Sequence, residues 1–473
     1  MKWLFCVFLF VSSIVAQSQS SILQTRIDKL LENEFYQRAA IGIAVYDLTA
    51  QEMVYTHNEK KLCRPASNMK LLTSAAALTV LTSRYVFKTD LYYTGDIDST
   101  GLLNGDIYII GGFDPELRTV DLDTLISKMK KIGINNIKGN LYLDTSMADS
   151  THWGQAWCWD DDMEPFQPYL SAIPLNKGVA RLKISPAAIG EEPTITIAPE
   201  TNFIKVVNRA QTIEKSTETS EKTLKFAREF VDGSNVITVS GSIAAKAKDY
   251  ETSISLKNPY DFVLTVFLEK IAENFPESVI LTSAAKQVPA DAQIIGYVSH
   301  YISDVIRRLN KNSDNLNAEM CLYAMGYKQG SRPASLIKGA YAVQTFITKT
   351  GLSAKGYNIV DGSGLSNYNY VSPELIVAVL RYMHKSPYFD MYKKSLPVAG
   401  VDGTLTSRMK NTKAHRNAAA KTGSMTGVCA LSGYVTGSNG HLMAFSILVQ
   451  NFVDRSSVVS VNFIDKICEA IAQ

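Results

Sequence analysis

The chain has 473 residues, of which 46% are hydrophobic, 20% charged and 10% aromatic, with 28 glycines and 15 prolines. This usage excludes a largely disordered, collagenous or coiled-coil protein. The 48 basic and 45 acidic residues give a formal net charge of +3, so the charge balance gives no reason to expect a nucleic-acid partner. At roughly 100–200 residues per domain, the length predicts about two to four domains.

Residues 1–18 have the pattern of a secretory signal peptide. Lys2 is followed by the run Leu4–Val15, which is apolar except for two serines, and small or polar residues at Ala16–Ser18 offer a cleavage point. The run is well short of the ~20 apolar residues that a membrane-spanning helix needs. We therefore expect an exported protein that has no transmembrane segment after the signal peptide is removed near Ala16–Ser18.

The cysteines and histidines do not indicate a metal site. Five cysteines remain after the signal peptide, at wide spacings and without a Cys-x-x-Cys pair, and the six histidines are isolated from one another. This pattern fits neither a zinc site nor a dense disulfide framework. We expect buried thiols, although a single disulfide in an oxidising compartment stays open.

The expected elements change character twice along the chain. Helical spacing over 22–35 is followed by two strands within 41–55 and by an Ala- and Leu-rich helix over 67–81. Short alternating strands separated by Gly, Asn, Asp and Pro then dominate residues 89–286. Helices return over 302–309, 317–325, 333–350 and 373–384, and the chain closes with strands over 428–435 and 441–450 and a helix from about 457. This order predicts one α+β domain that is interrupted by a β-rich insertion.

A Ser-x-x-Lys motif stands at the start of the helix over 67–81. Residues three apart share a helix face, so the Lys70 amine can reach the Ser67 hydroxyl. A desolvated lysine has a depressed pKa and can act as a base, and a helix N-terminus places N–H groups near a developing oxyanion. The same spacing recurs at Ser127, Ser283, Ser335 and Ser407, so the motif needs supporting context.

Two later motifs supply that context in a fixed order. Ser313-Asp-Asn315 lies in a polar turn that opens a helix, where it offers a second hydroxyl and a side-chain amide. Lys-Thr-Gly occurs twice. The copy at 349–351 follows a long helical pattern and reads as a helix C-cap, whereas the copy at 421–423 precedes a hydrophobic strand. A second Ser-x-Asn, at 460–462, follows both copies and fails the order. The selected set is therefore Ser67, Ser313 and Lys421.

This set is the signature of penicillin-binding proteins and serine β-lactamases. More narrowly, the chain resembles the D-alanyl-D-alanine carboxypeptidase/endopeptidase family of class C low-molecular-mass penicillin-binding proteins, from about Ile22 to the C-terminus. The resemblance rests on blocks at 64–78, 111–115, 311–319, 361–366, 396–405 and 420–428. It implies a β-lactamase/transpeptidase-like α+β domain, with an antiparallel sheet flanked by helices, over 21–88 and 287–473. The residues between, 89–286, match the large insertion of the family and form one or two subdomains.

The resemblance also implies catalytic roles. Ser67 attacks the carbonyl between two D-alanines, Lys70 acts as the base, and Ser313 relays the proton to the leaving amine. The backbone N–H groups of Ser67 and Ser424 form the oxyanion hole. No metal or cofactor is needed.

Further residues are implied to hold the substrate. Lys421 and Thr422, in the strand with Gly423, bind the terminal carboxylate, and Asn315 binds the substrate amide. An acidic stretch in the family contacts the substrate side-chain amine, which makes Asp161, or its neighbour Asp162, a candidate; the alternative is a solvated acidic loop. The block at 361–366 is interpreted as a turn against the active-site wall.

These roles predict a periplasmic serine DD-peptidase that acts on peptidoglycan stem peptides and is acylated by β-lactam antibiotics. One alternative is a serine β-lactamase, against which the length of the insertion argues. Another is a non-catalytic envelope-binding protein on the same fold, against which the three intact motifs argue. Carboxypeptidase and endopeptidase action use the same acyl-enzyme, so the choice between them stays open, as do the oligomeric state and the function of the insertion.

Overall fold

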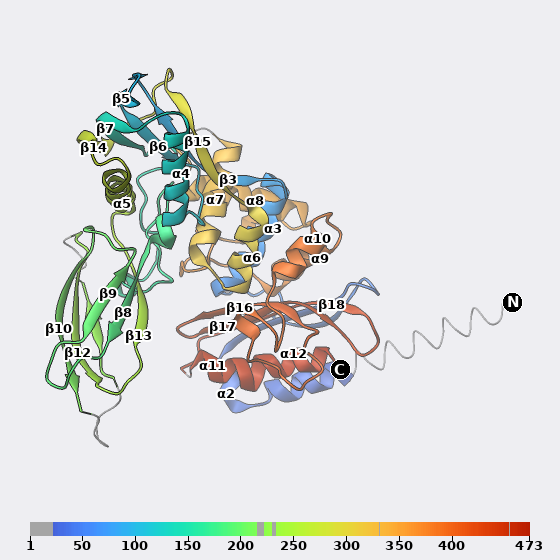
Figure 1. Cartoon of the computed structure of the whole chain (residues 1–473). Helices are drawn as coiled ribbons and strands as arrows, with labels where there is room; N and C mark the ends of the chain where they lie inside the picture. Colours follow the sequence, from blue (N-terminus) through green and yellow to red (C-terminus); the bar gives the residue numbers. More distant parts are fainter. Residues whose placement is uncertain (1–21, 215–221, 229–232, 331, 454) are drawn as a thin grey trace.

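The protein consists of a body of helices around one sheet and a sheet-rich insertion that projects from it (Figure 1). The structure is a computed structural model that describes residues 22–214, 222–228, 233–330, 332–453 and 455–473. The expected signal peptide, 1–18, lies outside the described residues.

The sheet of the body joins the two ends of the chain. Its strand order is β16-β17-β18-β1-β2, and every neighbouring pair is antiparallel. The first strand pairs with the last, from Ala40 opposite Gln450 to Asp47 opposite Met443. Most residues of the three central strands are buried because helices cover both faces of the sheet. The strands are β1 (Ala40–Asp47), β2 (Glu52–His57), β16 (Ala419–Met425), β17 (Val428–Thr436) and β18 (Leu442–Gln450).

The two helical layers differ in size (Figure 1). One face of the sheet carries a short layer made of residues 22–31, α2 (Glu34–Gln37), α11 (Ser456–Val459) and α12 (Asp465–Ile471). The other carries the larger layer, which consists of α3 (Met69–Leu81), α6 (Ile302–Lys311), α7 (Asn315–Gln329), α8 (Leu336–Lys349), α9 (Pro373–His384) and α10 (Phe389–Ser395). The helix expected over 67–81 begins as the 3₁₀ turn η1 (Ala66–Asn68) and continues as α3, which is buried along most of its length. This arrangement confirms the predicted fold class.

The insertion is built on a seven-stranded sheet of order β15-β3-β6-β7-β5-β4, with β14 paired to β7. Its strands are β3 (Val86–Tyr93), β4 (Asp96–Ile97), β5 (Leu102–Asn104), β6 (Ile107–Gly111), β7 (Asn136–Asp144), β14 (Val279–Ala285) and β15 (Gln293–Tyr301). Two three-stranded sheets follow, β13-β8-β9 and β10-β12-β11. They consist of β8 (Val179–Ser185), β9 (Thr194–Ala198), β10 (Lys205–Ile213), β11 (Lys225–Ala227), β12 (Val236–Ala244) and β13 (Tyr250–Ser255). The insertion also holds two helices that the sequence analysis did not predict, α4 (Thr119–Lys131) and α5 (Pro259–Asn274).

Strand pairing shows where the chain enters and leaves this sheet. β15 pairs with β3, from Gln293 opposite Tyr93 to Tyr301 opposite Val86, and α6 follows immediately. The expected range 89–286 begins inside β3 and leaves β15 outside, although the two strands are partners. We therefore propose 86–301 as the extent of the insertion.

The described part of the chain contains no helix long and apolar enough to cross a membrane. The five cysteines within it are free thiols, and all of them except Cys158 are buried. Burial raises the pKa of the Cys63 thiol to about 11, so this neighbour of the Ser-x-x-Lys motif stays protonated near neutral pH.

Candidate active site

Ser67 lies in the tight turn η1. Two glycines, Gly364 and Gly423, allow neighbouring segments to pack closely against this turn. Gly364 has φ +87°, and a Cβ built on it would lie 1.9 Å from the carbonyl oxygen of Ala66. A Cβ on Gly423 of β16 would lie 2.8 Å from the carbonyl oxygen of Pro65. On the same side, the Asn68 side chain donates to the carbonyl of Lys421 at 3.0 Å. The turn that carries Ser67 is therefore held between a loop and an edge strand.

Lys70 lies one turn further along, in the first turn of α3, and is fully buried. Its Nζ lies 2.9 Å from Ser67 Oγ, 2.5 Å from Asn315 Oδ1 and 2.7 Å from the carbonyl oxygen of Ser363. Burial lowers the pKa of Lys70 to about 8, against the opposing charges of three carboxyl groups, Asp361, Glu319 and Asp314. A neutral amine can donate to two of these acceptors and turn its lone pair to the Ser67 hydroxyl, which is the geometry of a general base.

A second lysine reaches the same place from β16. Lys421 is fully buried, and its Nζ donates to Ser313 Oγ and to the carbonyl of Thr422, both at 2.9 Å. Burial, and then the positive charge of Lys70, lower the pKa of Lys421 well below its usual value. Two buried ammonium groups oppose each other, so the site favours at least one neutral amine.

The remaining residues predicted for substrate binding line the solvent side of these amines. Asn315, Thr422 and Ser424 are partly or fully exposed, and Gly423 is buried against the turn of Ser67. The Thr422 hydroxyl donates to the hydroxyl of Thr404 at 2.8 Å. β16 is the edge strand of its sheet, so alternate backbone groups face away from β17 and can pair with an extended ligand.

Behind Lys70, two carboxyl groups hold the loop 361–366. Glu319, one turn after Asn315 on α7, is fully buried and accepts from the backbone N–H groups of Gly362 and Ser363. Burial, and then the charge of Asp361, raise the pKa of Glu319 to about 8. Asp361 accepts from the backbone N–H groups of Gly364 and Ser366 in the same loop, and from the side-chain amide of Asn369 just beyond it. The loop therefore presents the carbonyl of Ser363 to Lys70.

Glu319 and Ser363 also lie at the site, although neither was predicted from the sequence. A signal was present for Glu319, because a carboxyl group stands within an apolar helical stretch and inside one of the blocks that carry the resemblance. Ser363 acts through its backbone, so its residue type carried no signal.

The insertion contacts the site through the loop 157–166. Asn315 donates to the carbonyl of Phe166 at 2.7 Å, and the indole N–H of Trp157 donates to Asp361 at 2.9 Å. Asp161, in η2 (Trp159–Asp161) of this loop, is half-buried; burial, and then its acidic neighbours, raise its pKa. Asp162 is engaged elsewhere, with the Tyr169 hydroxyl at 2.5 Å and Arg228 at 3.0 Å. The loop is thus beside the site, and Asp161 stays a prediction.

The fold and these side chains together define a class. A serine and a lysine one helical turn apart, a second serine with an asparagine at the start of another helix, and a Lys-Thr-Gly edge strand are the constellation of penicillin-binding enzymes and serine β-lactamases.

Within that class the chain belongs to the D-Ala-D-Ala carboxypeptidase 3 (S13) family, whose pattern matches residues 23–471. It is 32% identical to a D-alanyl-D-alanine carboxypeptidase of Actinomadura sp. (strain R39), over 90% of this chain and 80% of that protein. Its fold matches the crystal structure of penicillin-binding protein 4 from Haemophilus influenzae with a TM-score of 0.82 and 24% identity, over 94% of this chain and 99% of that one. The same protein complexed with a β-lactam matches with a TM-score of 0.75 and 25% identity, over 94% and 98%. The resemblance found in the sequence is confirmed.

Proposed function

We propose that this serine DD-peptidase cleaves the D-alanyl-D-alanine bond of peptidoglycan stem peptides through an acyl-enzyme on Ser67. The observation that carries the proposal is the fully buried Lys70 amine, 2.9 Å from Ser67 Oγ, with a pKa lowered to about 8. The assignment of the cleaved bond is supported by the name of the Actinomadura relative and by the match of this chain to the carboxypeptidase family.

In the acylation step, the neutral amine of Lys70 takes the proton of Ser67 while Oγ attacks the carbonyl carbon of the penultimate D-alanine. The backbone N–H groups of Ser67 and Ser424 stabilise the tetrahedral oxyanion. When the peptide bond breaks, Ser313 relays the proton that Lys70 took to the leaving amine of the terminal D-alanine, and Lys70 is neutral again. The hydrogen bond that Lys421 Nζ donates to Ser313 Oγ supports this relay, because it holds the Ser313 hydroxyl in place while Lys421 keeps the charge that binds the carboxylate.

The substrate lies along the open edge of β16. Its terminal carboxylate binds Lys421 and the Thr422 hydroxyl, and Gly423 leaves room for the strand to approach the turn of Ser67. Because burial disfavours the charged form of Lys421, an arriving carboxylate restores it. Asn315 holds the substrate amide. Asp161, on the loop that also contacts Asn315 through Phe166, holds a basic group of the stem peptide.

Water then hydrolyses the acyl-enzyme and releases the shortened peptide. Cleavage of a terminal D-alanine and opening of a cross-link share this intermediate. A β-lactam acylates the same serine, and the β-lactam complex of the similar H. influenzae protein supports this expectation. The substrate and the pattern of residues 1–18 support a location in the periplasm.

The test is the mass of the intact protein after incubation with benzylpenicillin, for wild type and for Ser67→Ala. A persistent adduct on wild type alone is expected. Rapid return to the free mass with consumption of the drug would move the assignment to a β-lactamase. No adduct and no consumption would leave only the non-catalytic alternative.

A further inference from the structure

One lysine of the insertion lies against the second catalytic motif. Lys177 Nζ is 3.1 Å from Asp314 Oδ2, where Asp314 stands between Ser313 and Asn315, and it also donates to the side-chain carbonyl of Asn317. Asp314 in turn caps α7, because its Oδ1 accepts from the backbone N–H of Asn317 at 2.9 Å. Lys177 therefore contacts the motif at Asp314 and the first turn of α7 at Asn317.

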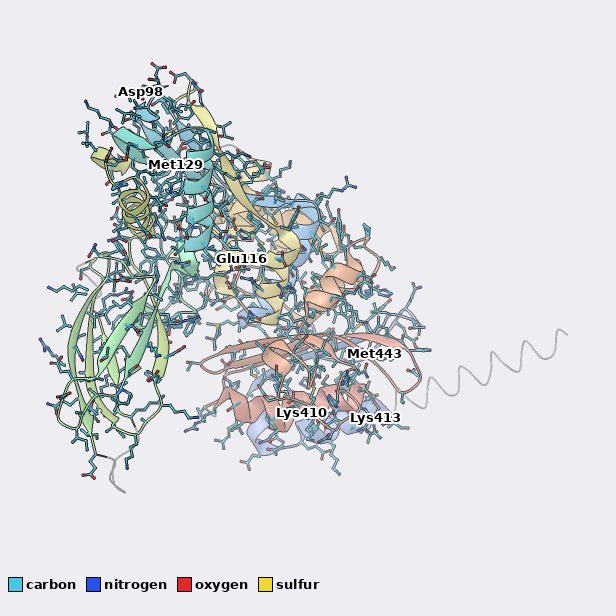
Figure 2. All side chains as sticks on the ribbon, in the orientation of Figure 1. Asp98, Glu116, Met129, Lys410, Lys413 and Met443 are labelled. Carbon is cyan, nitrogen blue, oxygen red and sulfur yellow. The ribbon has the colours of Figure 1, made fainter. Side chains whose placement is uncertain are left out.

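Glu116 anchors this lysine from the insertion side. Its side chain is only 3% exposed and lies 2.8 Å from Lys177 Nζ. The same carboxylate accepts from Asn317 Nδ2 at 2.8 Å and pairs with Arg308 of α6. Glu116 lies where the insertion meets the helices of the body (Figure 2). Insertion and body thus share one buried carboxylate, and Lys177 links it to the motif.

The backbone holds Lys177 in an unusual conformation. Asn176, Lys177 and Gly178 are consecutive residues with positive φ, at 49°, 63° and 66°. The Asn176 side chain donates to the Thr119 hydroxyl and accepts from its backbone N–H, which ties the turn to the start of α4. Non-glycine residues in this conformation cost free energy and persist where the surrounding structure fixes them. Lys177 is therefore placed by the fold.

The charge of Lys177 matters for Lys70. The negative charge of Asp314 raises the pKa of Lys70 against the effect of burial. Groups from four parts of the chain face Lys70. They are Ser67 on its own turn; Asp314, Asn315 and Glu319 at the start of α7 and within it; Asp361 and Ser363 in the loop 361–366; and Lys421 on β16. Lys177 forms the ion pair with Asp314, so it offsets one of the carboxyl groups that favour the ammonium form.

We propose that Lys177 is a positioning residue for catalysis: it fixes the turn of Ser313 and Asn315 and cancels the charge of Asp314 beside the catalytic lysine. This role rests on the proposed acyl-enzyme function and gives the insertion a direct part in it. Because Lys177, Glu116 and Arg308 border an open cavity of about 570 Å³, water screens the effect to a modest size.

The test compares Lys177→Met with Lys183→Met in the rate of acylation by benzylpenicillin between pH 5 and 10. Lys183 lies on β8 in a half-exposed ion pair with Asp249, at 2.7 Å, and serves as the matched control. In Lys177→Met, the uncompensated Asp314 favours the charged Lys70, so the acid limb of the profile shifts up by about 0.5–1 pH unit. The rate at pH 7 then falls about three- to tenfold. With a D-Ala-D-Ala peptide, kcat is expected to fall by a larger factor than KM rises.

Asp314→Asn removes the charge of Asp314 but keeps its capping role, because asparagine also caps a helix well. It therefore distinguishes an effect of the charge from an effect of lost structure. In the Lys177→Met background it is expected to return the acid limb to within a few tenths of a pH unit of wild type. On its own it is expected to shift the limb to lower pH, which tests the same point if Lys177→Met does not fold. A wild-type profile for Lys177→Met, or a fall in rate without any shift, overturns the inference. Wild type that is not acylated at all overturns the proposed function instead.

Discussion

The body and the insertion contribute to the site in different ways. The body supplies the groups to which we assign the reaction: Ser67 and Lys70 at a helix start, Ser313 before α7, and Lys421 on an edge strand. The insertion contacts residues next to these groups and not the groups themselves. The contacts are made by the Phe166 carbonyl, the Trp157 indole and the Lys177 ammonium. The comparison teaches that the chemistry comes from short local motifs, whereas their orientation depends on contacts between residues far apart in sequence.

The largest effect is expected in the body. Lys70→Met removes the amine beside Ser67 and is expected to slow acylation by benzylpenicillin about a thousandfold, the usual range for loss of a general base. The control is Lys130→Met, because Ser127 and Lys130 have the same spacing on α4 in the insertion. A similar loss in both variants would contradict the assignment of the base.

The next effect tests how tightly the body encloses Ser67. In Gly364→Ala the new Cβ meets the carbonyl of Ala66, so the turn must move, and acylation is expected to fall about 10- to 100-fold. Gly440→Ala is the matched control: φ is +80° there too, but nothing lies within 4 Å of the added Cβ. Equal rates in the two variants would show that the close approach at Gly364 does not position Ser67.

A smaller effect is expected from the insertion. Trp157→Phe keeps an aromatic side chain, although a smaller one, and removes the N–H donor to Asp361, which holds the loop that presents Ser363 to Lys70. The acylation rate is expected to fall about two- to fivefold, because one hydrogen bond is lost and it affects Lys70 only through the loop. Trp159→Phe, on the same loop but 69% exposed, serves as the control. If both variants keep the wild-type rate, the hydrogen bond between Trp157 and Asp361 does not influence acylation.

The last prediction concerns stability and not the reaction rate. The pKa of Glu319 is raised from 4.5 to about 8 in the folded protein, so the folded state binds this proton more tightly than the unfolded state does. The stabilisation is complete below about pH 4.5 and is lost as the pH rises towards 8. Relative to Glu319→Gln, the melting temperature of wild type is therefore expected to fall between pH 5 and 8. The underlying change is up to about 1.4 kcal/mol per pH unit. If the melting temperatures of wild type and Glu319→Gln change with pH in the same way across this range, burial does not hold the proton on Glu319.

The sequence predicted the body better than the insertion. The spacing of Ser67 and Lys70 places them on one helix face, so their contact could be expected before any tertiary structure was known. The order of the motifs selected Ser313 and Lys421, but only the fold brings their side chains to 2.9 Å. The buried residues of α4 have helical spacing, yet alternating strands on both sides obscured the pattern.

Other features left no local trace. β3 and β15 are partners although about two hundred residues separate them, so the proposed end of the insertion at Tyr301 depends on pairing rather than on composition. Lys177 stands in no recognisable motif, and the part that we propose for it rests on contacts such as the ion pair with Asp314. Glu319 carried a weak signal as a lone carboxyl group in an apolar helix, but its partner loop is far away in sequence.

The central claim is that Ser67, activated by Lys70, cleaves the D-alanyl-D-alanine bond. The most direct measurement is the release of D-alanine from an acylated tripeptide that ends in D-Ala-D-Ala, with wild type and with Ser67→Ala at equal concentration. We expect steady release by wild type and none above background by the variant. Equal release by the two proteins would contradict it.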